Sequence, residues 1–199
     1  MMGLYKKLLG GFMQTRIYEY LLKNIIPYIR FTTYYTTLKG EKYHKMYDLL
    51  KPGDVILTTD KKKLTSLLIP GEFSHAAFCV SRDKCWETSE MTHEDYRKSC
   101  FFDLCKESDR VVILRPNLPS KAILSAIIKC KSFQNAKYDV NFYLGIKALY
   151  CSELIYQSFE KNELGVDLSD LIGLGRHYIS PDGLYSADNL DVIIDSDLI

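Results

Sequence analysis

The sequence lacks the features of several protein classes. No apolar run approaches the ~18 residues that a membrane-spanning helix needs. No Cys-x-x-Cys pair occurs, and the spacing of Cys and His residues matches no zinc site. The net charge of +1 provides no overall basic field, so we expect no nucleic-acid partner. With 6 Pro and 11 Gly but 47% hydrophobic residues in 199, the composition excludes a disordered or collagen-like chain.

The first residues, MMGLYKKLLGGFMQTR, lack the long apolar stretch of a secretory signal. We therefore expect a cytoplasmic protein in a reducing compartment, whose cysteines are mostly small buried hydrophobic residues. We expect no metal and no cofactor. The six cysteines are Cys79, Cys85, Cys100, Cys105, Cys130 and Cys151.

Charge and tyrosine are concentrated in the first quarter of the chain. Residues 1–50 contain eight Lys/Arg and three Asp/Glu, a net charge of +5, while the remainder has a net charge of −4. Eight of the 15 tyrosines also lie in this part. We predict a basic, Tyr-rich helical extension over residues 1–47 and a catalytic domain over residues 48–199.

Residues 16–30 have the periodicity of an amphipathic helix, with Tyr18, Leu22 and Ile26 on its apolar face. Pro27 removes a backbone donor and should kink or end this helix. Two interpretations stay open. The helix docks on the domain, or it lies in a membrane interface and gives the protein a peripheral membrane contact.

The rest of the chain predicts an α+β fold, because strands and helices occur in blocks and do not alternate strictly. Pro-Gly at residues 52–53 and 70–71 marks turns. A loop is expected at residues 138–142. The predicted strands cover residues 55–58, 75–80, 85–88, 111–114 and 192–194, and the predicted helices cover residues 64–69, a segment that starts at 119–120, and residues 151–162.

Cys151 opens the last of these helices. Helix N-terminal N–H groups favour an anion, so we expect the thiol pKa to fall below its usual ~8.5. The same N–H groups suit an oxyanion that forms when a thiolate attacks a carbonyl. A thiolate nucleophile needs an imidazole as proton acceptor, and His75, which follows Ser74 at the start of a predicted strand, is the best candidate.

Other titratable residues have simpler interpretations. Glu153 lies in the first turn of the Cys151 helix, where negative charge suits the helix dipole, so we expect a structural role. His93 stands among Glu90, Glu94 and Asp95, which we interpret as a solvated loop and not as a metal site.

Three blocks together resemble a known family. Residues 50–57 (LKPGDVIL), residues 68–77 (LIPGEFSHAA) and residues 150–154 (YCSEL) are similar to circularly permuted NlpC/p60-type papain-like cysteine peptidases. The resemblance is strongest to the YiiX-like branch, which is related to a poxvirus protein group and to lecithin:retinol acyltransferase. It covers roughly residues 48–195. His75 precedes Cys151, which is the permuted order.

The resemblance implies a third polar residue on the strand that pairs with the His75 strand, and we predict Glu87 in this position. A hairpin places residues at its two ends side by side, so this carboxylate could orient the imidazole. The acyltransferase relatives use a second His here. Tyr138 and Ser74 are further candidates for substrate binding.

The implied fold is a papain-like α+β domain, a small antiparallel sheet or partial barrel with packed helices. The implied function is a cysteine hydrolase or acyltransferase that acts through Cys151, His75 and Glu87 on an amide, thioester or lipid-ester bond. Its partner would be an acyl, lipid or peptide substrate. Two alternatives stay open: a cell-wall peptide amidase or endopeptidase, and a non-catalytic binding module that uses the papain-like cleft. The first fifty residues have no counterpart in the minimal fold.

Overall fold

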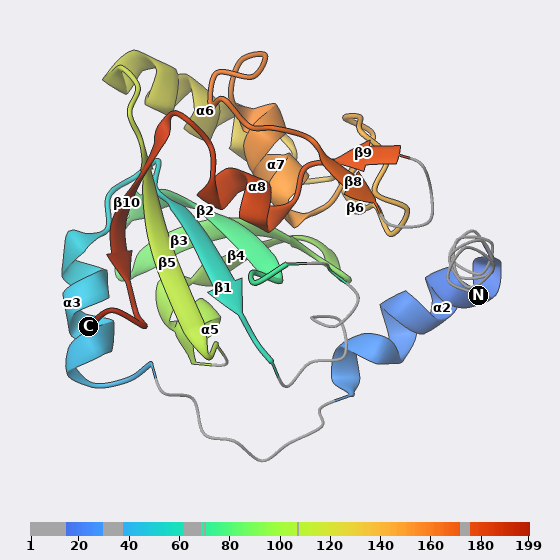
Figure 1. The fold of residues 1–199 in the computed structure, drawn as a ribbon, viewed down its shortest axis with the longest axis horizontal. Helices are drawn as coiled ribbons and strands as arrows, with labels where there is room; N and C mark the ends of the chain where they lie inside the picture. The colour runs from blue at the N-terminus through green and yellow to red at the C-terminus, as the bar shows by residue number, and fades with distance from the viewer. Residues whose placement is uncertain (1–14, 30–37, 62–68, 70, 107, 172–175) are drawn as a thin grey trace.

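A six-stranded antiparallel sheet forms the centre of the molecule (Figure 1). The computed structural model describes residues 15–29, 38–61, 69, 71–106, 108–171 and 176–199. The strand order is β10-β5-β1-β2-β3-β4. The strands are β1 (Val55–Thr59), β2 (His75–Arg82), β3 (Trp86–Thr92), β4 (Asp95–Cys100), β5 (Arg110–Pro116) and β10 (Leu190–Asp195).

The central strands are buried on both faces, which explains their continuous apolar runs. Every residue of β1 is buried. Along β1, Val55 and Leu57 belong to one hydrophobic core, while Ile56 between them belongs to a second core on the other face.

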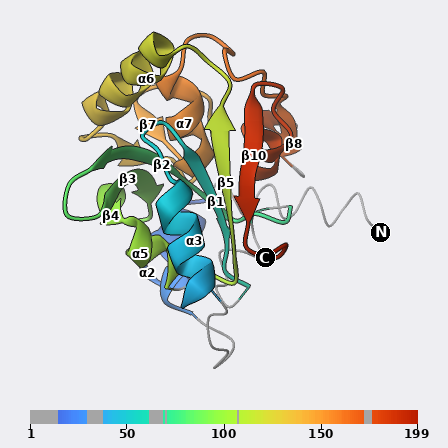
Figure 2. The same cartoon turned by 90° about the vertical axis from the view of Figure 1, so that its left-hand side faces the viewer.

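Helices α6 (Ser120–Ser132), α7 (Cys151–Ser158) and α8 (Pro181–Tyr185) form the larger core with the first face of the sheet (Figures 1 and 2). The buried side of α6 consists of Ala126, Ile127 and Cys130, as the sequence pattern predicts. Leu154 and Ile155 of α7 are fully buried in the same core. The core thereby fixes α7 against β2.

Helices α3 (Glu41–Leu49) and α5 (Phe101–Cys105) cover the opposite face. Met46 of α3 is fully buried in the second core, and Tyr43 stacks on Phe101 with ring centroids 5.7 Å apart. The predicted boundary after residue 47 therefore falls inside a helix that packs as part of the domain.

Helix α2 (Arg16–Asn24) lies at the edge of the molecule, well away from α6 (Figure 1). The Thr15 hydroxyl caps its N-terminus by accepting a hydrogen bond from Tyr18 N–H. A 3₁₀ turn, η1 (Ile26–Tyr28), follows at Pro27, where the sequence predicts an interruption. Buried Tyr18 and Leu22 pack with Val140 in a small third cluster. The helix is thus docked on the domain.

Two short pairs of strands flank the site described below. Strands β6 (Lys137–Tyr138) and β7 (Ala148–Leu149) are parallel, and β8 (Ser169–Leu171) and β9 (Arg176–Tyr178) are antiparallel. The loop that the sequence predicts at residues 138–142 lies between β6 and β7, except that Tyr138 belongs to β6 and pairs with Leu149.

The structure confirms the α+β fold and the predicted strands, with longer ends. Two details differ. The helix that starts at Cys151 ends at Ser158, earlier than the predicted residue 162. The sequence predicts Glu90, His93, Glu94 and Asp95 in a solvated loop, but Glu90 is buried in β3. Residues 92–95 form a tight turn between β3 and the unpredicted strand β4. The predicted helix at residues 64–69 lies almost entirely outside the described residues. Within the described ranges, no helix is long and apolar enough to cross a bilayer.

Candidate active site

Cys151 is the first residue of α7 and is almost completely buried. Tyr150 before it is the N-cap and has an extended backbone. Both neighbours of Cys151 are anchored to one residue: Ile179 N–H donates to the Tyr150 hydroxyl (2.8 Å), and the Ser152 hydroxyl donates to the Ile179 carbonyl (2.7 Å). These two bonds fix the backbone on either side of the thiol.

His75 begins β2 and pairs with Thr58 of β1. The segment just before it is held from α8, because Glu72 N–H and Phe73 N–H both donate to the Asp182 carboxylate (2.9 and 3.2 Å). The imidazole side chain is 24% exposed, in contrast to the buried thiol. Helix α7 packs on β2, so the start of the helix meets the start of the strand.

The Cys151 thiol and the His75 ring lie close enough to shift the pKa of each other through hydrogen bonding and charge. Burial by itself would raise the pKa of Cys151. The hydrogen bond and charge of His75, with the backbone N–H groups of Ala76 and Ser152, outweigh burial and lower it. Burial opposes the charged imidazole too, but the bonds to Cys151 and Glu90 raise the pKa of His75 to about 9. The site therefore favours a thiolate beside an imidazolium.

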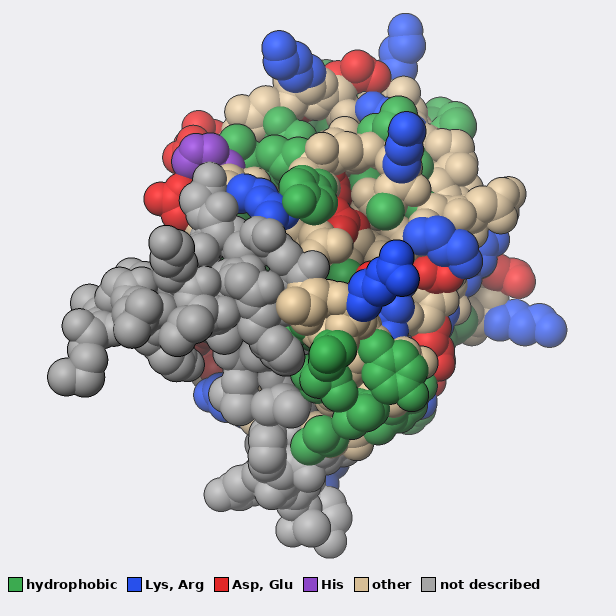
Figure 3. Space-filling view, turned by 90° about the vertical axis from the view of Figure 1, so that its right-hand side faces the viewer, with side chains coloured by type: hydrophobic (Ala, Val, Ile, Leu, Met, Phe, Trp, Pro, Cys, Tyr) green, Lys and Arg blue, Asp and Glu red, His purple; other side chains and the backbone are tan. Residues whose placement is uncertain are grey.

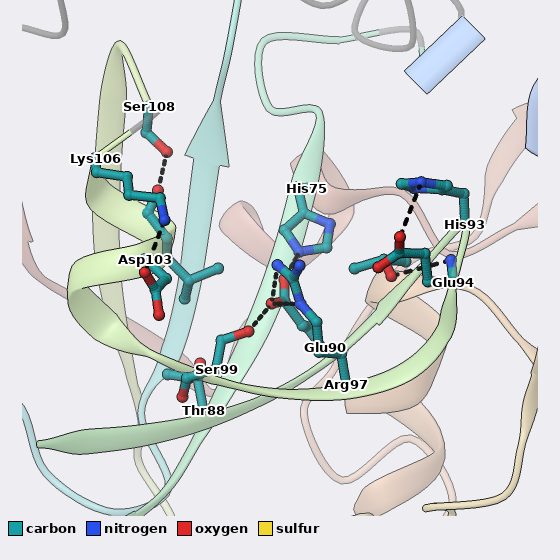
Figure 4. Close-up of polar contacts among 12 residues, drawn as sticks. His75, Thr88, Glu90, His93, Glu94, Arg97, Ser99, Asp103, Lys106 and Ser108 are labelled. Carbon is teal, nitrogen blue, oxygen red and sulfur yellow. Dashed lines mark hydrogen bonds and ion pairs between the residues drawn. The ribbon is translucent and has the colours of Figure 1, made fainter. Parts of the chain in front are cut away.

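A buried carboxylate completes this arrangement (Figure 4). Glu90 Oε2 lies 2.5 Å from His75 Nε2. Since Nε2 is engaged there, Nδ1 is the ring nitrogen that remains for the thiol. The other oxygen, Oε1, accepts hydrogen bonds from Arg97 Nε and Nη2 (3.0 and 2.8 Å) and from the Ser99 hydroxyl. Three donors thus hold one oxygen and leave the second for His75.

Glu90 is 1% exposed, and burial opposes its ionisation. The hydrogen bond and charge of His75, followed by Ser99 and Arg97, overcome this effect and lower its pKa to about 2. The carboxylate is therefore ionised at neutral pH. A fixed negative charge at Nε2 orients the ring and stabilises its protonated form.

The carboxylate that contacts His75 is Glu90 and not the predicted Glu87. The β2–β3 ladder pairs Glu87 with Ser81, six residues along β2 from His75, whereas Glu90 pairs with Ala77. Residues 87 and 90 also differ by an odd number and so point to opposite faces of the strand. Glu87 is 35% exposed and lies 3.8 Å from the Lys98 ammonium.

Tyr138 and Ser74, the other predicted site residues, lie in different surroundings. Burial raises the pKa of the Tyr138 phenol, and the proximity of Cys151 and then of Tyr18 raises it further. Tyr138 packs against both the larger core, which includes Cys151, and the small cluster of Tyr18, Leu22 and Val140. The Ser74 hydroxyl accepts a hydrogen bond from Asp60 N–H (3.4 Å), which connects the end of β1 to the start of β2.

Two carboxylates hold the loop in front of α7. Asp139 accepts from Asn141 N–H (2.8 Å) and Tyr143 N–H (2.6 Å). Glu153, fully buried in the first turn of α7, accepts from Gly145 N–H (2.7 Å). Burial raises the pKa of Glu153 to about 7 against the opposing effect of this hydrogen bond. Glu153 thus has the structural position that the sequence predicts, but burial changes its charge state.

Sequence reasoning missed Glu90, Arg97 and Ser99. A signal was available for Glu90. When the predicted strand is lengthened to Thr92, Glu90 falls within it and its side chain points to the same face of the sheet as His75. Arg97 and Ser99 alternate on β4, which was not predicted at all. Among the described residues, no cluster of three or more His, Cys, Asp or Glu side chains is placed to hold a metal.

Comparisons with known proteins identify the fold and the family of this chain. One solved structure, described as the metalloprotein yiiX from Escherichia coli O157:H7, aligns with a TM-score of 0.62 and 18% sequence identity. The alignment covers 72% of this chain and 96% of that chain, and it confirms the papain-like fold. No curated protein matches the chain. The sequence model of the permuted papain-like amidases, the YaeF/YiiX or C92 family, matches residues 49–196, so this chain belongs to that family of cysteine hydrolases.

Proposed function

We propose that the chain hydrolyses or transfers an acyl group through Cys151, His75 and Glu90. The observation that carries this proposal is the linked set of contacts from the Cys151 thiol through the His75 ring to the buried carboxylate. A nucleophile, its base and an orienting group within hydrogen-bond reach are the requirement for covalent catalysis.

The chemistry follows from the positions of the protons. The Cys151 thiolate attacks the carbonyl carbon, an S–C bond forms, and the carbonyl π electrons move to the oxygen. N–H groups at the start of α7 are positioned to stabilise that oxyanion. The His75 imidazolium then gives its proton to the leaving amine, thiol or alcohol, and a thioester remains on Cys151. His75 deprotonates water or another acceptor, which attacks the thioester and releases the thiolate.

Aromatic and apolar residues surround the nucleophile and favour an apolar acyl group. Phe142, Tyr150 and Tyr178 form a ring cluster with centroid separations of 5.0 to 6.4 Å, in the same core as Cys151. Tyr138 packs against this core and against the small cluster that includes Tyr18 of α2. We assign an amide, thioester or lipid ester as the bond, and Tyr138 as a substrate contact. The six free thiols support a reducing, cytoplasmic location.

The test is intact-mass detection of an acyl-enzyme. The protein is incubated with p-nitrophenyl and thioester substrates of increasing acyl length, quenched with acid, and digested to locate the adduct. We expect the acyl group on Cys151, and its absence in Cys151→Ser and His75→Ala. Cys100→Ser is the matched control, because Cys100 is more exposed than Cys151 but does not contact His75 in the site described above.

Each alternative gives a different result. Labelling of Cys100 or Cys85 before Cys151 means that exposure decides reactivity, and it would support a non-catalytic binding module. Turnover of peptidoglycan fragments without turnover of acyl esters would assign the site to a cell-wall amidase or endopeptidase. The first result contradicts the catalytic proposal, and the second contradicts the assignment of an apolar acyl group.

A further inference from the structure

Helix α2 has more apolar surface than the domain covers. Tyr18 and Leu22 face the domain and are buried. Ile17 and Tyr20, which lie on the flank of the helix turned away from these two residues, are 66% and 61% exposed. The apolar exposure continues past the helix end through Ile25 and Ile29. A helix that only had to dock on this domain would not need apolar residues on that second flank.

Basic residues border this flank. On a helical projection Arg16 and Lys23 lie next to Tyr20, on the side away from the buried Tyr18. Figure 3 views the side of the molecule that includes α2, and hydrophobic side chains gather there beside Lys and Arg side chains. The net charge of +5 in residues 1–50 contrasts with −4 in the remainder. The basic charge is therefore concentrated in the part of the chain that contains α2.

The helix is also adjacent to the nucleophile. Its buried residue Tyr18 belongs to the cluster with Val140, and Tyr138 packs both against this cluster and against the core that includes Cys151. The Tyr28 hydroxyl lies 3.3 Å from His93 Nε2 at the β3–β4 turn, which ties the end of this segment to the strands that hold Glu90 and Arg97. A partner seated on α2 would therefore lie near the substrate site.

We propose that the exposed flank of α2 and η1 docks on an anionic lipid bilayer, with Ile17 and Tyr20 in the interface and Arg16 and Lys23 at the headgroups. A surface that combines aromatic and aliphatic residues with a basic border is the form that interfacial helices take. Docking needs no turnover, so it is independent of the proposed reaction. It would bring the site to substrates that reside in the membrane.

The test is co-sedimentation of the full chain with vesicles of phosphatidylcholine alone and with phosphatidylserine added. We expect binding to the serine-containing vesicles that weakens as salt is raised. Ile17→Ser and Tyr20→Ser should each weaken it about tenfold. Arg16→Gln should weaken it roughly fivefold and leave any residual binding to phosphatidylcholine unchanged. Cys151→Ser should bind like the unsubstituted protein, which separates docking from catalysis.

Leu124→Ser is the matched control. Leu124 is 58% exposed, close to the exposure of Tyr20, and lies on α6 at the far end of the molecule (Figure 1). Equal loss of binding in this variant, or binding that ignores phosphatidylserine, would overturn the proposal. So would absence of binding to either vesicle. Light scattering tests whether a second copy of the chain binds this flank instead. A dimer that dissociates in Tyr20→Ser would assign the flank to such a copy and overturn the proposal.

Discussion

Glu90 Oε2 lies 2.5 Å from His75 Nε2, while its Oε1 is held by Arg97 and Ser99. The carboxylate is thus fixed from the outer strand β4 and contacts the imidazole from β3. Because Arg97 is itself 48% exposed, the charge that stabilises Glu90 reaches solvent while the carboxylate does not. The surroundings of the His75 ring are consequently built from three neighbouring strands, β2, β3 and β4.

The two candidate carboxylates can be distinguished directly. Glu90→Gln removes the negative charge at His75 Nε2, so we expect the rate of Cys151 alkylation by iodoacetamide at neutral pH to fall about 10²-fold or more. Glu87→Gln changes an exposed side chain beside Lys98 and should leave the rate within about twofold. Similar rates for the two variants would remove Glu90 from the mechanism.

Arg97 should act through Glu90 as a positioning residue. Arg97→Met keeps most of the aliphatic stem but removes two hydrogen bonds to Oε1. The pKa of Glu90 should rise and that of His75 should fall, with a loss of roughly tenfold in alkylation rate at neutral pH. The decisive readout is the pH profile, since a purely structural role would lower the rate at every pH without shifting the curve.

The thiolate–imidazolium pair defines a pH window. Cys151 has a lowered pKa, so the stability gained from its thiolate is present above its unfolded value and is lost as pH falls through the lowered one. His75 has a pKa of about 9, so its contribution is complete below 6.5 and is lost as pH rises through 9.

Alkylation of Cys151 should therefore begin well below pH 8 and disappear from that range in His75→Ala. Burial raises the pKa of Cys79, Cys105 and Cys130, which should stay unlabelled in the same samples. Peptide mapping by mass spectrometry over a pH series measures all of these thiols at once. Early labelling of a buried thiol would contradict the expected order.

Glu153 should make the fold less stable as pH rises. Its folded pKa of about 7 exceeds the unfolded value of 4.5, so folded protein binds more protons between these limits and stability falls as pH passes through them. The loss amounts to about 3 kcal/mol above pH 7. Glu153→Gln removes this pH-dependent loss of stability. The unfolding free energy of the variant, relative to that of the unsubstituted protein, should therefore increase from pH 5 to pH 8. Urea unfolding at both pH values tests this, and a constant difference would rule it out.

Gly71 should tolerate no side chain. It has a φ of +123°, and a Cβ atom there would lie 2.1 Å from Asp182 Oδ2, the carboxylate that accepts from Glu72 and Phe73 just before His75. Gly71→Ala should cost about 2 kcal/mol and lower the Tm by roughly 4–8 °C. Gly145→Ala is the control, because nothing lies within 4 Å of the place that its Cβ atom would take and its φ is not positive. Equal Tm values would show that the Asp182 contact adapts freely.

Buried strands and periodic helices were predictable because each has a local signal. The apolar run of β1 reflects a strand in which every residue is buried, and the 3.6-residue pattern of α6 reflects a helix with one buried side. Strand β4 has no such signal. Its residues are exposed or partly exposed at the sheet edge, so polar Asp95, Arg97 and Lys98 resemble a loop.

The site residues that lie at the start of a helix or strand could be predicted from the sequence. Cys151 opens a helix and His75 opens a strand, and both facts are visible in the sequence. The carboxylate depends on the register of a hairpin with a bulge between Cys79 and Ser81, where one residue of shift reverses the side-chain direction. Composition does not reveal that bulge.

The order of the elements along the chain also bears on synthesis. The sheet strands β1 to β5, including His75 and Glu90, emerge from the ribosome before Cys151, which follows them by more than one complete helix. Helix α7 needs an existing sheet to pack on, and β10, which closes the sheet edge beside β5, is made after all the other strands of that sheet. His75 and Glu90 are therefore already part of the nascent chain when Cys151 is made. In the permuted order the helix that starts at Cys151 packs onto strands that precede it along the chain.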